Sequence, residues 1–194
     1  MKNYISFVKK FLRNNKSYIF LALIFLFLSI FSLFFIPISE DIKNIFITQA
    51  KASMLENYSS DSLILMWNIF RNNSFIGLLI LLSWFMMSLF SLLVMFWNVM
   101  IMFIILPLTI EKVWFLKTVL LLLPHWILEI TAILLSVALS FKITVLVFKK
   151  IWNWKQNKLI PYLKEIFEFR LIFVFPLFLI AAFVESFITP LFMK

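Results

Sequence analysis

The sequence predicts an all-α fold, a polytopic transmembrane helix bundle of about five spans with interfacial amphipathic helices. Hydrophobic residues make up 64% of the chain and charged residues only 14%, and the mean hydropathy of +1.05 lies far outside the range of soluble domains. Several apolar runs exceed the ~20 residues that a helix needs to cross a bilayer. They lack the alternating polarity of a barrel, and Gly77 is the only glycine.

The residue inventory excludes several chemistries. Without cysteine there are no disulfides, thiolate metal sites or cysteine nucleophiles, and one glycine cannot build a phosphate-binding loop or a nucleophile elbow. The net charge of +9 is explained by membrane orientation, since Lys and Arg gather on the cytoplasmic side. We therefore expect no enzyme activity, no cofactor and no nucleic-acid partner, and the lipid bilayer as the surroundings of the chain.

The N-terminal part of the chain has the pattern of a signal anchor. Residues 1–16 carry five basic residues and no acid, and residues 17–38 form the first apolar run. The bulky Phe34, Phe35 and Ile36 differ from the small residues of a cleavage site, so we expect this run to remain as the first span.

Residues 39–73 are predicted to form an external amphipathic segment. Acidic and basic residues mix here, and apolar residues recur at helical spacing, which favours interfacial helices. The apolar positions that carry this pattern are Ile42, Ile45, Phe46, Leu63, Met66, Trp67 and Phe70.

The central spans are predicted within residues 74–148. A first run is too long for one untilted crossing. A break near Ser88, Ser91 and Asn98 would divide it into crossings at residues 75–90 and 92–106, whereas a continuous helix would have to tilt or protrude. A further crossing is expected at residues 116–147, where Pro124 should kink or start a helix.

A second basic segment follows at residues 149–170, and residues 171–193 are predicted to form the last span, which crosses at residues 171–192 and bends at Pro176. Both basic segments can be cytoplasmic only if an even number of crossings separates them. We therefore expect a multi-pass cell-membrane protein, one membrane domain over residues 1–194, with a cytoplasmic N-terminus and an external C-terminus.

Two acidic residues, Glu129 and Glu185, lie inside apolar runs. His125 precedes Glu129 by four residues and Thr189 follows Glu185 by four, so each carboxyl shares a helical face with a polar companion. Burial of such groups is costly, which favours a hydrogen-bonded cluster that fixes helix packing. A proton or solute pathway and an intramembrane metal site are the alternatives, although no second histidine is present.

The small residues beside these carboxyls predict where the two helices pack. Each helix has a small-residue edge that lets a neighbour approach closely. The edges consist of Ala132, Ser136 and Ser140 on one helix and Ala182, Ser186 and Pro190 on the other. We expect the two helices to pack directly, with Glu185 close to His125 or Glu129, directly or through a water.

Residues 123–133, Leu-Pro-His-Trp-Ile-Leu-Glu-Ile-Thr-Ala-Ile, resemble the Pro-His-Gly-Ile-x-Glu-x-Pro-Ala signature of the stage II sporulation protein M family. Residues 182–190 are similar to the Glu-x-x-x-(Thr/Ser)-Pro element of that family, which ends here at Pro190. Asn72-Asn73, before the second apolar run, is similar to the Asn-Asn pair of the family. The resemblance spans nearly the whole chain. Trp126, Val99 and Thr131 depart from the family pattern.

The resemblance implies a non-catalytic membrane scaffold or complex subunit, with envelope remodelling as the associated process. Its signature residues in this chain would be Asn72, Asn73, Pro124, His125, Glu129, Glu185, Thr189 and Pro190. Membrane or envelope proteins are the implied partners, and a homo-oligomer is left open. The alternatives are a small transporter or permease component that uses the His/Glu cluster and, third, an intramembrane metal hydrolase. A polar cavity that reaches one face would favour the transporter, and a closed, satisfied cluster the scaffold.

Overall fold

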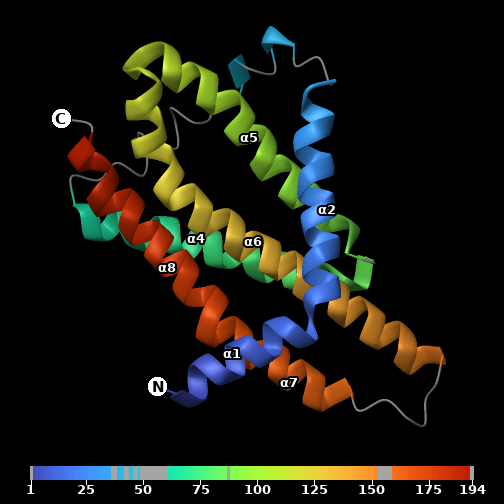
Figure 1. Ribbon diagram of the computed structural model, residues 1–194. Helices are drawn as coiled ribbons and strands as arrows, with labels where there is room; N and C mark the ends of the chain where they lie inside the picture. Colours follow the sequence, from blue (N-terminus) through green and yellow to red (C-terminus); the bar gives the residue numbers. More distant parts are fainter. Residues whose placement is uncertain are drawn as a thin grey trace.

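The described residues of the protein form helices and no strands, which confirms the predicted all-α class. The computed structural model describes residues 2–35, 39–41, 44–45, 48, 61–86, 88–152 and 159–192. Within these residues, five helical segments are long and apolar enough to cross a membrane. Figure 1 shows them crossing one another at oblique angles, with α6 running diagonally between α5 and α8.

The first two helices meet at Asn15. Helix α1 (Lys2–Asn14) is strongly amphipathic and lies against α7, where Phe11 stacks on Phe169 with ring centroids 4.0 Å apart. Helix α2 (Lys16–Leu33) is apolar on all sides, as expected for the first span. The predicted span extended to residue 38, whereas the helix ends at Leu33, and residues 36–38 lie outside the described part of the chain.

The second span begins earlier than the sequence predicts. Helix α4 runs without a break over Ser62–Leu82 and continues into the 3-10 turn η1 (Ser83–Met86). The predicted boundary between an external segment and the span, at residues 73–75, therefore differs from the observed helix. The polar residues in the first half of α4 favour an external segment when only the sequence is considered, but in the folded chain they line a cavity. The amphipathic helix expected around residues 42–46 lies mostly outside the described residues.

The break in the central run lies at Ser88, as expected. Helix α5 (Leu89–Val113) starts after Ser88, which has a left-handed φ of 62°. A chain of buried hydroxyl groups fastens this turn to α6: Ser140 Oγ lies 3.0 Å from Ser83 Oγ and 2.9 Å from Ser88 Oγ. Ser88 Oγ also lies 2.8 Å from Thr144 Oγ1. Thr144 Oγ1 in turn donates to the Trp84 carbonyl at 3.3 Å, so α6 also satisfies a backbone group of the turn.

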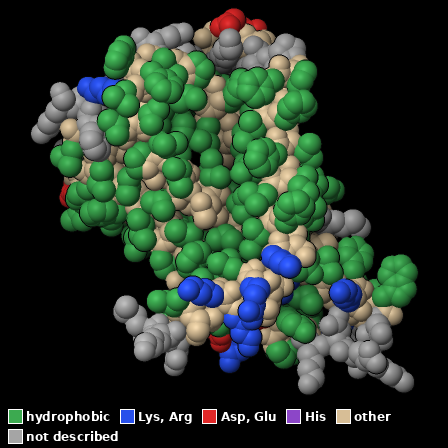
Figure 2. Space-filling model, in the orientation of Figure 1, with side chains coloured by type: hydrophobic (Ala, Val, Ile, Leu, Met, Phe, Trp, Pro, Cys, Tyr) green, Lys and Arg blue, Asp and Glu red, His purple; other side chains and the backbone are tan. Residues whose placement is uncertain are grey.

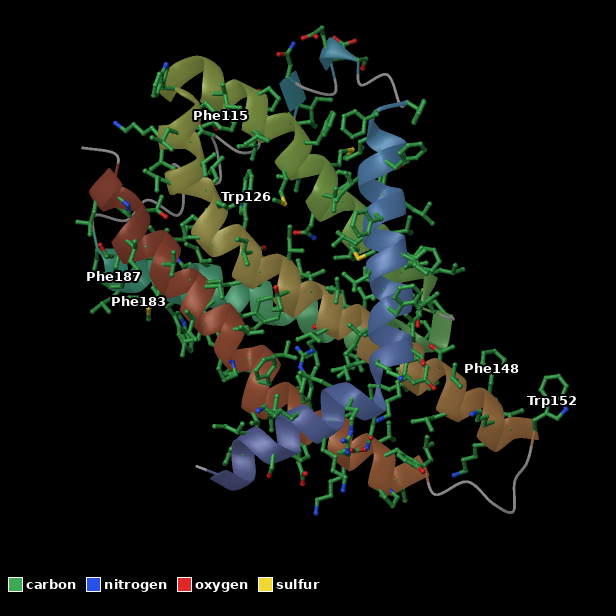
Figure 3. The ribbon with its side chains drawn as sticks, in the orientation of Figure 1. Phe115, Trp126, Phe148, Trp152, Phe183 and Phe187 are labelled. Carbon is green, nitrogen blue, oxygen red and sulfur yellow. The ribbon has the colours of Figure 1, made fainter. Side chains whose placement is uncertain are left out.

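Helix α6 (Phe115–Trp152) is the longest element and the centre of the bundle. It packs against α2, α4, α5 and α8, and its residues 132–143 are buried without interruption. Pro124 lies inside the helix, and the helix changes direction between Phe115 and Trp126 (Figures 1 and 3). This matches the kink expected at Pro124, since proline removes one helical hydrogen bond.

The last span is a chain of helical segments. Helix α7 (Leu159–Phe169) leads through the π turn η2 (Arg170–Val174) into α8 (Phe175–Phe183), followed by the π turn η3 (Val184–Ile188) and the 3-10 turn η4 (Thr189–Phe192). Pro176 lies at the start of α8. Each π turn inserts one extra residue and so changes which side chains face the bundle.

Basic residues gather at one end of the molecule. Figure 2 shows Lys and Arg side chains at the lower end and hydrophobic side chains over the middle. Exposed residues of this end are Lys9, Lys10 and Arg13 on α1, Lys149 on α6 and Lys164 on α7. Lys142 is buried beneath α1 and α7, where its Nζ lies 3.4 Å from Glu165 and 4.7 Å from the Phe11 ring centroid.

Candidate functional site

A partly open cavity of about 870 Å³ lies between α4, α5, α6 and η3. Helix α4 supplies the polar lining residues Asn68, Arg71, Asn72 and Asn73. The other polar lining residues are Asn98, His125, Glu129 and Glu185. Polar groups from four elements that are far apart in the sequence therefore meet in one hollow, whose remaining walls are apolar and aromatic.

Helix α6 places His125 and Glu129 on the cavity wall, one helical turn apart as their spacing predicts. His125 is 5% exposed, and its Nδ1 has no hydrogen-bond partner among the described residues. Trp126 lines the cavity beside it, on the side of α6 that faces α5 (Figure 3), with the two ring centroids 5.9 Å apart. Glu129 forms no hydrogen bond or ion pair within the described part of the chain.

Glu185 reaches the same cavity from the π turn η3. The Glu129 carboxyl group lines this cavity too, so the acidic residues of two separate helices face one hollow. The two helices pack directly, and both small-residue edges are largely buried. The predicted packing of the last span against α6 is therefore confirmed, and Glu185 and Glu129 line the same cavity. Phe183 and Phe187 project from the other side of the last span (Figure 3).

Thr189 and the two signature prolines have structural positions outside the cavity lining. Thr189 is buried, and its Oγ1 donates a hydrogen bond to the Leu121 carbonyl at 3.4 Å, which ties the end of the last span to α6. Pro124 lies in the bent part of α6, one residue before His125. Pro190 lies in the 3-10 turn η4.

The signature asparagines differ in exposure although both line the cavity. Asn73 is buried and Asn72 is exposed on α4. On the opposite wall, Asn98 uses its Nδ2 to donate to the Val94 carbonyl at 2.8 Å, so its Oδ1 is available as an acceptor.

The sequence analysis does not predict a polar contact between Arg170 and the backbone of α4. The chain pattern places Arg170 in the cytoplasmic segment, but its side chain is buried: Nη1 donates to the Gly77 carbonyl at 2.7 Å and Nη2 to the Ser74 carbonyl at 3.1 Å. A Cβ atom at Gly77 would lie 2.7 Å from Phe178 Cε2. The single glycine was the available signal, since a lone glycine in an apolar helix indicates close approach of another element.

The site offers binding groups rather than a metal centre. Among the described residues, no group of three or more His, Asp or Glu side chains is arranged to hold a metal ion. The cavity presents two carboxyl groups, amides and an imidazole, which can bind a polar solute or transfer protons.

Comparison with known protein families matches residues 5–190 to the family described as Stage II sporulation protein M. No curated protein and no solved structure matches the chain. The match covers nearly the whole chain, including Asn72, Asn73, His125, Glu129 and Glu185. The chain therefore belongs to the stage II sporulation protein M family of membrane proteins.

Proposed function

We propose that the protein is a non-catalytic membrane subunit that binds a polar ligand in its intramembrane cavity, as a small transporter or the binding component of a transport complex. The observation that carries this proposal is that the polar side chains line a partly open hollow of about 870 Å³. A cavity of this size accommodates a small organic molecule.

The contrast with the other polar clusters supports this function. Arg170 and the hydroxyl groups around Ser140 are fully engaged with neighbouring helices, as expected for groups that hold a bundle together. His125 Nδ1, Glu129 and Glu185 have no hydrogen-bond partners among the described residues. A purely structural cluster would pair these groups with one another, because an unpaired buried polar group is costly.

A scaffold is the second candidate, and one feature outside the cavity favours it. The end of α6 projects beyond the bundle and carries exposed apolar side chains (Figure 3), with Ile151 69% and Trp152 89% exposed. Such a surface suits a membrane or envelope protein partner. A role in envelope remodelling is what the family resemblance implies for this candidate.

We further propose that the basic end faces the cytoplasm. The lysines and arginines of α1, the end of α6 and α7 gather there, and cytoplasmic segments of membrane proteins are enriched in these residues. The N-terminus is then cytoplasmic, and the chain crosses the cell membrane five times.

Two variants at different places separate the two candidates. Ile130 lines the cavity, so Ile130→Trp fills it, whereas Trp152→Ala removes the exposed tip of α6. Affinity purification in mild detergent would be followed by mass spectrometry of both proteins and small molecules. We expect the wild type to retain a small molecule that Ile130→Trp loses and Trp152→Ala keeps.

The control is Ile127→Trp, which adds the same bulk at a position of α6 that is 55% exposed. A stoichiometric partner protein lost only in Trp152→Ala, with no retained small molecule in any variant, would favour the scaffold and contradict the binding function.

A further inference from the structure

No cationic side chain of the described residues pairs with the two carboxyl groups of the cavity. Glu129 and Glu185 form no ion pair within the described part of the chain, although a carboxylate inside a membrane protein normally faces a cationic partner. The buried cations are engaged elsewhere: Arg170 binds carbonyls of α4 and Lys142 binds Glu165. The cation that would match the carboxyl groups is therefore not supplied by these buried residues of the chain.

The rest of the lining also favours a cationic group. Asn98 offers its Oδ1 because its Nδ2 is bonded to the Val94 carbonyl, and His125 adds a buried imidazole ring to the wall. Trp126 adds an aromatic ring, whose face attracts cations. Arg71 also lines the cavity, but it is exposed on α4 and pairs with neither carboxyl.

We propose that the ligand of the cavity carries an ammonium group, which binds between Glu129 and Glu185 beside Trp126. This assignment rests on the proposed binding function and adds the class of ligand. Two carboxylates and an amide oxygen accept the N–H hydrogens of a primary ammonium group. A divalent metal ion fits the site less well, because the described residues provide no cluster of three metal-ligating side chains.

The test compares three probes that share a phenyl ring and differ in charge: phenethylammonium, phenethyl alcohol and phenylacetate. Each is titrated into the purified full-length protein in detergent, and binding is measured by calorimetry. We expect phenethylammonium to bind at least about tenfold more tightly than the other two, because only the cation gains charge-assisted hydrogen bonds.

Glu129→Gln and Glu185→Gln should each weaken phenethylammonium binding about tenfold, since each keeps the shape of the side chain but removes its charge. Glu168→Gln is the matched control, because Glu168 is exposed on α7 away from the cavity and its loss should leave binding unchanged. The control also corrects for partition of the amine into detergent. Melting temperature without probe shows that each variant is folded.

Equal binding of the cation by the wild type and by a Glu129→Gln/Glu185→Gln variant would overturn the ammonium assignment. Preferential binding of the alcohol or of phenylacetate would also overturn it, but would leave the cavity as a ligand site. If no probe binds and the purified wild type retains no small molecule, both the assignment and the proposed binding function fail.

Discussion

Gly77, the only glycine of the chain, lies where α4 and α8 approach closely. The Phe178 ring occupies the space that a Cβ atom would take, and the Gly77 carbonyl accepts a hydrogen bond from Arg170. Glycine lowers the stability of a helix interior by about 1 kcal/mol relative to alanine. Its presence in α4 is therefore explained by tertiary packing and not by helix propensity.

We expect Gly77→Ala to destabilise the protein by about 1–2 kcal/mol, because the clash with Phe178 exceeds the gain in helix propensity. The free energy of unfolding would be measured in mixed micelles by titration with a denaturing detergent. Phe178→Leu should lose packing on its own but relieve the clash, so the double variant should be more stable than the sum of the two changes predicts. Additive effects would show that the two residues do not interact.

Some residues of the site could be predicted from the sequence and others could not. Glu129 and Glu185 could be predicted because a carboxyl inside an apolar run has few explanations, and helical spacing places His125 on the face of Glu129. Arg170 could not, because it follows a run of lysines and the π turn that carries it inward leaves no clear sequence pattern. Asn68 and Asn98 carry no such signal, because asparagine in helical segments also serves to cap helices or to join them.

Among the elements, the turn between α4 and α5 depends on hydroxyl groups of α6. Ser140 lies within hydrogen-bonding distance of both Ser83 and Ser88. The break itself could be predicted from the polar residues near Ser88. The early start of α4 could not, since its asparagines and arginine look the same whether they face water or a cavity.

We expect Ser140→Ala to lower the free energy of unfolding by about 1 kcal/mol, because it removes contacts that join two helices. Ser136→Ala is a control on the same helix: Ser136 is equally buried, but its Oγ bonds only to the Ala132 carbonyl of α6 itself. Its loss should change stability less. Both variants would be compared in the same mixed-micelle titration, and equal effects would contradict a role of Ser140 in fastening the turn.

For the whole molecule, the distribution of lysine predicts the orientation in the membrane. The chain has no cysteine, so single cysteines report on exposure without background. Lys164→Cys on α7 should resist an impermeant thiol reagent applied outside intact cells, and Ser62→Cys at the start of α4 should react. Both positions are exposed, and both should react in permeabilised membranes. The reverse pattern of labelling would invert the proposed orientation.

The number of spans could be predicted from the apolar runs, and parity supports it, because two basic segments on one side require an even number of crossings between them. The cavity could not be predicted in this way. It depends on how far α4 and α5 diverge after their turn, which is decided by side-chain packing and not by the hydropathy of each helix.

The contact between Arg170 and α4 has a consequence for how the protein is made. A ribosome synthesises the chain from its N-terminus, and the carbonyl acceptors at Ser74 and Gly77 precede Arg170 by 96 and 93 residues. When the last span leaves the ribosome, the helix that accepts its guanidinium hydrogen bonds has therefore already been synthesised. An arginine that would be costly to insert alone into lipid can thus meet its carbonyl acceptors on α4 as soon as it enters the bilayer.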